Sequence, residues 1–310
     1  MNDITSASIK VYGATDAGRL RKFNEDRFSL ANIDNGCVCF EQFAGFVGEE
    51  GFLMLVSDGA GGDGRGGIAS ALAVQVFQEE ILNSDPKQAY GKCLMDATRA
   101  ANELIWEQSR RTPETAGMAA TLTAAWIVPP LAYLVEVGDS RCYLVRNQTI
   151  KQLTRDQSMA QTLIDAGVLT PNSAKTHPYR NIVLQSLGAR ETVVPVVTTL
   201  ELARGDRLLI CSDGLSKKLS EAQILEIVAQ SREVAVACRL LIEKAKELGA
   251  EDNITVVLGI VDGEAFSLPQ AFPTLVLSEA ADEAELSDEL VDVTDILLPA
   301  SPSREEQTPG

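Results

Sequence analysis

The order of segments along the chain predicts an α+β fold, a four-layer α-β-β-α sandwich of two antiparallel sheets flanked by helix pairs. Segments with helical periodicity come in two pairs, and each pair stands among short apolar or alternating runs joined by tight links. A doubly wound parallel sheet would instead alternate strand and helix along the chain. Two antiparallel sheets packed face to face, with a helix pair on each outer face, therefore account for the pattern most simply.

The first half of the chain is expected to contain strands followed by the first helix pair. The strand segments are predicted at Ile9–Thr15, Phe28–Asn32, a glycine-bearing hairpin over Asn35–Gly51, and Phe52–Val56. The helices are predicted at Gly67–Asn83 and Pro86–Arg111. Because proline is favoured at the first helical position, the second helix is expected to begin at Pro86.

The second half opens with short strands whose tight links are typical of an antiparallel meander. These strands are predicted at Ala119–Val128, Leu131–Val137, Arg141–Arg146 and Thr149–Leu153. The uncharged run Gly117–Val135 approaches the length of a membrane span, but Pro129-Pro130 interrupts it, so a hairpin is expected there instead. The later elements are a helix at Ala160–Ala166, a strand pair of Val194–Leu200 with Arg207–Cys211, helices at Glu221–Ala229 and Glu233–Leu248, and a last strand at Ile254–Val261.

The charge of the chain is strongly acidic and unevenly distributed. The 310 residues carry a formal net charge of −17, and most of it lies beyond residue 261. We therefore predict a catalytic domain over residues 1–261 and an acidic, disordered tail over residues 262–310. Within this tail, Phe272–Leu277 and Leu286–Leu298 retain enough apolar residues to dock on a partner or on the body itself, which is the alternative to a plain solubilising tail. Because no basic block offsets the acid, a nucleic-acid partner is not expected.

Cysteine usage and the N-terminus indicate the compartment. The six cysteines lack C-x-x-C spacing and lie in apolar segments, which favours buried free thiols over disulfides or zinc. The first ten residues contain no basic segment followed by an apolar one, so no secretion signal is predicted. We expect a cytoplasmic protein that does not associate with membranes.

Aspartates at strand ends are the candidate chemical centre. The run Phe52–Val56 ends in Ser57-Asp58-Gly59, and Arg207–Cys211 ends in a second copy, Ser212-Asp213-Gly214. Asp26, Asp139 and Asp252 also adjoin strand ends or tight turns. Several carboxylates without accompanying histidines favour Mg²⁺ or Mn²⁺ over zinc. The single histidine of the chain, His177, is interpreted as a structural or surface residue.

A different interpretation of the same stretch is a dinucleotide site. Gly59, Gly61 and Gly64 satisfy the G-x-G-x-x-G pattern between a strand and a helix. However, Asp58 would place a negative charge beside the pyrophosphate, which this motif attracts with amide dipoles and a helix N-terminus. The absence of βαβ alternation weakens this interpretation further.

The ordered motifs resemble a known family, the metal-dependent serine/threonine protein phosphatases of the protein phosphatase 2C (PPM) type, in their compact bacterial form. The resemblance covers roughly residues 8–261. It depends on the joint order and spacing of Arg21-Lys22-Phe23-Asn24-Glu25-Asp26, Ser57-Asp58-Gly59-Ala60-Gly61-Gly62, Met118-Ala119-Ala120-Thr121, Gly138-Asp139-Ser140-Arg141, Leu153-Thr154-Arg155-Asp156, Ser212-Asp213-Gly214-Leu215 and Asp252-Asn253-Ile254-Thr255.

The resemblance implies a set of metal ligands. Asp58 would bridge two Mn²⁺ or Mg²⁺ ions, the Gly59 carbonyl would bind one of them, and Asp213 and Asp252 would bind the other. Asp139 matches a position that, with Asp213, holds a third, weaker ion in related enzymes.

The resemblance also implies the residues around the reacting phosphate. Glu25 and Asp26 would hold metal-bound waters, Arg21 would clamp the phosphate of the substrate, and Leu163–Leu187 would form a mobile flap. Two positions depart from the family pattern. Ala60 stands where some members carry a histidine considered a general acid, and Gln157 replaces a histidine that often follows the Thr-x-Asp pattern.

The function expected from the resemblance is hydrolysis of phosphoserine and phosphothreonine in proteins by a water that bridges two metal ions. The substrates would be phosphoproteins of a cognate serine/threonine kinase, and the enzyme would be a monomer that acts in signalling. The alternative is a catalytically silent phosphatase-like domain that binds and regulates a phosphoprotein or kinase.

Overall fold

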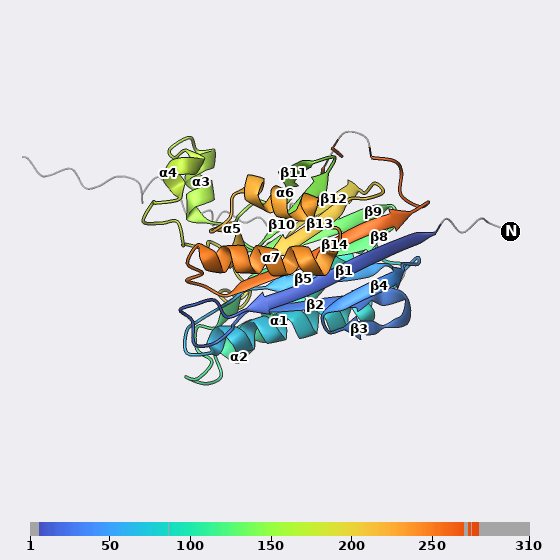
Figure 1. Cartoon of the computed structure of the whole chain (residues 1–310). Coiled ribbons are helices and arrows are strands. Elements are labelled where there is room, and N and C mark those ends of the chain that lie inside the picture. Colours follow the sequence, from blue (N-terminus) through green and yellow to red (C-terminus); the bar gives the residue numbers. More distant parts are fainter. Residues whose placement is uncertain (1–5, 86, 270–271, 274, 279–310) are drawn as a thin grey trace, which may run out of the picture. The chain divides into compact units, whose positions relative to one another are not determined.

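The structure confirms the predicted α-β-β-α sandwich of two antiparallel sheets (Figure 1). It is a computed structural model that describes residues 6–85, 87–269, 272–273 and 275–278. The described residues all belong to one compact unit, within which the helices and strands below lie.

The first sheet has six strands, in the spatial order β11-β10-β13-β14-β1-β4. Its strands are β1 (Ala7–Asp16), β4 (Gln42–Phe46), β10 (Arg141–Arg146), β11 (Thr149–Gln152), β13 (Arg207–Cys211) and β14 (Ile254–Gly263). The two long strands, β1 and β14, pair along their whole length from Ala7 opposite Gly263 to Asp16 opposite Ile254.

The second sheet has seven strands, in the order β15-β12-β9-β8-β5-β2-β3. Its strands are β2 (Arg27–Asn32), β3 (Cys37–Cys39), β5 (Phe52–Ser57), β8 (Leu122–Val128), β9 (Leu131–Val137), β12 (Val196–Glu201) and β15 (Val276–Ser278). A separate two-stranded sheet pairs β6 (Gly59–Ala60), which follows β5 in the chain, with β7 (Ala119–Ala120), which precedes β8. The predicted hairpin at Pro129-Pro130 is confirmed as the β8–β9 turn.

Each sheet is covered by its own helix pair. α1 (Arg65–Leu82) and α2 (Tyr90–Ser109) pack on the seven-stranded sheet, and α6 (Glu221–Gln230) and α7 (Val234–Glu247) pack on the six-stranded sheet (Figure 1). The described residues also form the short helices α3 (Met159–Asp165), α4 (Pro171–Ala174) and α5 (Asp213–Ser216). A 3-10 turn, η1 (Ile33–Asn35), links β2 to β3.

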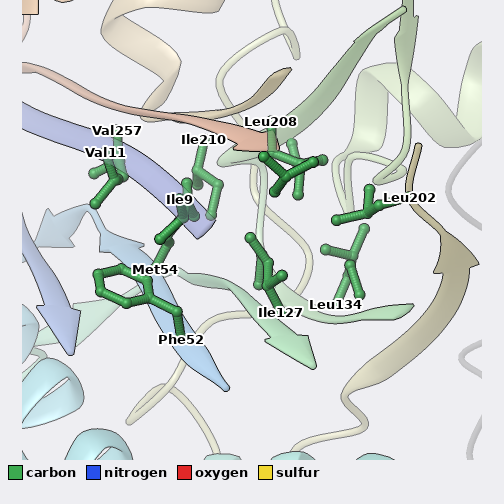
Figure 2. Close-up of a cluster of buried hydrophobic side chains, with 14 of the residues drawn as sticks. Ile9, Val11, Phe52, Met54, Ile127, Leu134, Leu202, Leu208, Ile210 and Val257 are labelled. Carbon is green, nitrogen blue, oxygen red and sulfur yellow. The ribbon is translucent and has the colours of Figure 1, made fainter. Parts of the chain in front are cut away.

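The space between the sheets is a continuous apolar core. Alternate residues of the facing strands point into it, among them Ile9 and Val11 of β1, Phe52 and Met54 of β5, and Leu208 of β13 (Figure 2). These side chains are almost completely removed from water. Burial at about 25 cal/mol per Å² of apolar surface makes this layer a main source of stability. It holds the ends of both sheets in a fixed relation.

Three predicted strand pairings are wrong, because the strands concerned belong to different sheets. The hairpin expected over Asn35–Gly51 splits, with β3 pairing with β2 and β4 pairing with β1. β12 and β13 do not pair with each other, since β12 joins β9 and β13 joins β10 and β14. The expected meander likewise breaks between β9 and β10. Alternating apolar patterns are the same in either sheet, so they cannot assign a strand to one of them.

The packed body continues beyond the boundary expected at residue 261. Phe266 is buried, and Phe272 and Leu275 pack against the core between the sheets. β15 then pairs with β12 at the edge of the seven-stranded sheet. The boundary was expected at residue 261 because residues 262–310 are strongly acidic when taken together. Residues 262–278 contain enough apolar side chains to pack on the body, and the average over the whole segment hides them. The predicted docking segment at Leu286–Leu298 lies outside the described residues.

The cysteines are free, as predicted, but they are not all buried. Cys93, Cys142, Cys211 and Cys238 are buried, whereas Cys37 is exposed and Cys39 is half-buried on the edge strand β3. In the part of the chain that the structure describes, no helix combines the length and apolarity that a bilayer crossing requires.

Candidate functional site

The predicted site residues meet at one end of the sandwich because the strand registers bring their elements there. Ser57 at the end of β5 is opposite Arg27 at the start of β2, so Asp58 lies near Asp26. Cys211 at the end of β13 is opposite both Arg141 and Val256. Asp139, Asp213 and Asp252 therefore gather at the same end of the six-stranded sheet. The β9–β10 link crosses between the sheets at this end, which explains why Asp139 belongs to the site.

Asp58 is fixed by hydrogen bonds to the strand beside it. Its backbone N–H donates to the Thr121 hydroxyl at 3.0 Å, and its carbonyl accepts from the Thr121 N–H at 2.8 Å. The Ser57 hydroxyl donates to the Thr121 carbonyl at 2.7 Å. The hydroxyls of Thr121 and Ser140 lie 2.8 Å apart. Thr121 thus connects the backbone of Asp58 with the turn that carries Asp139.

Asp26 is completely buried, and only one of its two carboxylate oxygens has a partner. Oδ2 accepts hydrogen bonds from the hydroxyls of Ser212 and Thr255, both at 2.8 Å. Among the described residues, Oδ1 has no hydrogen-bond partner. Burial, together with the nearby Asp213 and Asp252, raises the pKa of Asp26 to about 7 against the effect of these two hydrogen bonds.

Asn253 holds the loop that carries Arg21 and Glu25. Its Oδ1 accepts from the Glu25 N–H at 2.8 Å, and its Nδ2 donates to the carbonyls of Ala17 and Phe23 at 2.9 and 3.0 Å. The Glu25 carboxylate is buried and accepts from the Gly66 N–H at 2.9 Å, near the start of α1. The Glu25 side chain is therefore fixed between its own loop and the first helix.

Asp58 and Asp139 lie close enough to other carboxylates to disfavour their own charged forms. The pKa of Asp58 is raised well above its usual value by burial and by Asp26, Asp213, Asp139 and Asp252. The pKa of Asp139 is raised to about 7, first by burial and then by Asp213. A bound cation would relieve both costs, because it favours the ionised carboxylates.

Among the described residues, Arg21 and Lys217 pair with aspartates of the site. Arg21 Nη2 donates to Asp252 Oδ2 at 2.8 Å, with both side chains substantially exposed. Lys217 Nζ contacts Asp213 Oδ2 and lies 3.8 Å from Asp139 Oδ2. Exposed ion pairs contribute only about 0–1 kcal/mol, so the Arg21 pair is readily exchanged for another anion.

The residues fit divalent cations of the Mg²⁺ and Mn²⁺ type. The buried oxygens Asp26 Oδ1 and Asp213 Oδ1 lack hydrogen-bond partners within the described chain, which is costly unless a cation binds there. A Cβ on Gly59 would meet the Gly66 carbonyl oxygen at 2.1 Å, so only glycine brings the backbone this close. Within the described residues, no three His, Cys, Asp or Glu side chains stand at metal-ligand spacing. In this structure Asp252 pairs with Arg21 and Asp213 pairs with Lys217, so these two carboxylates are turned toward protein cations.

The predicted flap is tied to the site through Gln157. Its Oε1 accepts from the Gly138 N–H at 2.7 Å and from Gln185 Nε2 at 3.0 Å, and its own N–H donates to the Gly138 carbonyl at 2.8 Å. Gln157 therefore joins the Asp139 turn to the end of the flap. His177 lies within the flap and contacts Tyr179, apart from the carboxylates.

Sequence reasoning missed the positioning roles of several residues. Thr121 and Asn253 were part of the quoted motifs, but nothing in their spacing shows that they anchor Asp58 and the Arg21–Asp26 loop. Lys217 carried no signal at all, because a lysine after a short turn is ordinarily a solvated surface residue. The contact of Lys217 with Asp139 depends on the crossing of the chain between sheets, which was not predicted.

Fold and site together define a class of protein, an antiparallel α-β-β-α sandwich with carboxylates gathered at one end of its sheets. The family model for protein phosphatase 2C matches residues 30–251, and this chain belongs to the protein phosphatase 2C family.

Curated relatives are consistent with this assignment. The chain is 37% identical over 235 residues to the serine/threonine protein phosphatase PstP of Mycobacterium tuberculosis, which covers 76% of this chain and 45% of the relative. It thus spans about half the length of that protein. It is 32% identical over 251 residues to the serine/threonine phosphatase stp of Listeria monocytogenes, covering 79% of this chain and 92% of the relative.

Solved structures share the fold. A crystal structure of the Mycobacterium tuberculosis phosphatase PstP superimposes with a TM-score of 0.71 at 34% identity, covering 82% of this chain and 99% of the other. A crystal structure of the PstP catalytic domain in complex with two manganese ions gives a TM-score of 0.70 at 33% identity, covering 83% and 99%.

Proposed function

We propose that this protein is an active metal-dependent phosphatase that hydrolyses phosphoserine and phosphothreonine in proteins. The observation that carries the proposal is the convergence of Asp26, Asp58, Asp139, Asp213 and Asp252 at one end of the sandwich, with buried oxygens that lack partners among the described residues. Membership of the protein phosphatase 2C family supports it, as do relatives named as serine/threonine phosphatases.

In this proposal Asp58, the Gly59 carbonyl, Asp213 and Asp252 hold two Mn²⁺ or Mg²⁺ ions. The manganese ions named for the PstP catalytic domain support this choice. Bound in this way, the two ions would supply a bridging water that attacks phosphorus in line at neutral pH.

The other residues of the site position the reactants. Glu25 and Asp26, held by Gly66 and by the Ser212 and Thr255 hydroxyls, accept hydrogen bonds from ordered water. Arg21 leaves Asp252 and binds the substrate phosphate through its planar guanidinium, which matches two phosphate oxygens. Ala60 carries no ionisable group, so leaving-group protonation is assigned to water.

We further propose that the protein acts as a monomer in the cytoplasm, in signalling, and reverses the action of a cognate serine/threonine kinase. The relatives named as phosphatases support phosphorylated proteins as the substrates.

One assay tests the proposed function. Purified protein is incubated with p-nitrophenyl phosphate and with a phosphothreonine peptide, in Mn²⁺, in Mg²⁺ and in EDTA. Hydrolysis of both substrates that EDTA abolishes is the expected result. Phosphopeptide binding without hydrolysis in either ion would instead establish the silent regulatory domain.

Replacing Arg21 by alanine is expected to raise KM for a phosphopeptide by roughly tenfold to a hundredfold, with a smaller loss in kcat. A charge-assisted hydrogen bond contributes about 1.5–3 kcal/mol, and one made equally in ground and transition states appears in KM. Steady-state kinetics at saturating Mn²⁺ measure the effect. Lys22→Ala, an exposed cation of the same loop, is the matched control for charge loss. Unchanged KM and kcat in Arg21→Ala would show that Arg21 does not bind the substrate phosphate and is an ordinary surface residue.

A further inference from the structure

Lys217 places an ammonium group between two of the carboxylates assigned to metal binding. Its Nζ contacts Asp213 Oδ2 and lies 3.8 Å from Asp139 Oδ2. Both carboxylates are nearly buried, with side-chain exposures of 13% for Asp213 and 6% for Asp139, whereas the lysine side chain is 38% exposed. The aliphatic part of Lys217 thus extends inward from the surface, and its ammonium group lies beside carboxylates that are largely shielded from solvent.

The backbone fixes Lys217 in this place. Lys217 is the residue directly after the short helix α5, and its N–H donates to the Asp213 carbonyl at 2.8 Å. The separation of four residues puts the two side chains on one face of the turn. A Cβ on Gly214 would meet the Asn253 carbonyl oxygen at 1.9 Å, so α5 is held tightly against the start of β14. The backbone of Lys217, and with it the start of the side chain, therefore has a fixed position beside Asp213.

The two oxygens of Asp213 face different partners. Oδ2 contacts Lys217, whereas the buried Oδ1 has no hydrogen-bond partner among the described residues. Oδ1 therefore remains available for one of the two ions of the proposed function. Asp213 Oδ2 and Asp139 Oδ2 share the Lys217 ammonium, so both oxygens already have a cation beside them. A divalent ion at the same position would lie a few ångströms from the ammonium, and repulsion between like charges at that distance is substantial.

We propose that Lys217 serves as a built-in cation that takes the place of a third metal ion between Asp139 and Asp213, so that this protein binds two divalent ions rather than three. The inference rests on the proposed function, because it assumes ions at Asp58 and Asp213. Asp139 is then a partner of Lys217 and a support for the β9–β10 turn, and manganese does not bind to it. Lys217 also keeps Asp213 oriented, so that Oδ1 faces the two-ion site.

The test counts bound Mn²⁺ by equilibrium dialysis over a range of manganese concentrations. The wild-type protein is expected to bind two ions, and Asp139→Asn is expected to leave that number unchanged. Lys217→Met, which keeps the length of the side chain and removes its charge, should gain a third ion with an affinity at least about tenfold higher than any third ion of the wild type. The double variant Lys217→Met with Asp139→Asn should lose that ion again.

The controls separate this effect from general charge loss. Lys218→Met removes the neighbouring ammonium, which pairs with Glu251, and should still bind two ions. Lys217→Arg keeps the charge and should also bind two. A third ion in the wild type that Asp139→Asn removes would overturn the inference, as would a count of two in Lys217→Met. If Lys217→Met does not fold, the comparison of wild type with Asp139→Asn still decides. A wild-type protein that binds no manganese would overturn the proposed function itself.

Discussion

Asp58→Asn and Asp213→Asn are each expected to lower kcat for p-nitrophenyl phosphate by about a thousandfold or more. An amide is a poorer ligand than a carboxylate for hard cations, and the charge stabilisation that a metal site supplies amounts to several kcal/mol, with each 1.4 kcal/mol equal to tenfold in rate. Steady-state or single-turnover hydrolysis at saturating Mn²⁺ measures the rate, and equilibrium dialysis measures how much manganese each variant binds.

The same substitutions should leave the fold intact and, for Asp58, make the metal-free protein more stable. Burial and four neighbouring aspartates raise the pKa of Asp58, so its ionised form destabilises the folded state. Asparagine removes that charge. Asp63→Asn is the matched control, since Asp63 lies in the same glycine loop with an almost fully exposed side chain and a φ of 51° that asparagine tolerates equally. Near-normal turnover in either ligand variant would show the two-ion assignment to be wrong.

Much of the fold could be predicted from local patterns. β9 begins and ends at the predicted residues, and β14 and α6 differ from prediction by one or two residues at one end, because apolar periodicity and end signals are encoded within the segment. The allocation of strands to sheets could not be predicted. β4 pairs with β1 rather than with β3 through contacts between residues thirty or more positions apart, and no short pattern encodes such contacts.

The site shows the same division between local and distant information. Asp58 and Asp213 could be identified because each follows a buried strand and precedes a glycine. The crossing of the chain from β9 to β10 is what carries Asp139 to them, and the sequence suggested only a hairpin turn there. The supporting hydrogen bonds of Thr121 and Asn253 join segments that are 63 and 228 residues apart. Residues that position others in this way are recognisable only once the fold is known.

A chain that ends at Gly263 is expected to be less stable than the full chain by about 3–5 kcal/mol, whereas a chain that ends at Ser278 should match it. The first truncation removes the buried side chain of Phe266, the packing of Phe272 and Leu275, and strand β15. Loss of one buried phenylalanine alone costs about this much. The second truncation retains all of them.

Urea unfolding followed by circular dichroism measures both differences, and Leu268→Ala, an exposed apolar residue of the same segment, is the control. At a temperature where both truncated chains are folded, each should hydrolyse p-nitrophenyl phosphate at the full-length rate, because the proposed ligands all precede Ile254. Equal stability of the chain ending at Gly263 would place the end of the folded body back at residue 261. Slower hydrolysis of a phosphoprotein, with an unchanged rate on the small ester, by the chain ending at Ser278 would assign a docking role to residues 279–310.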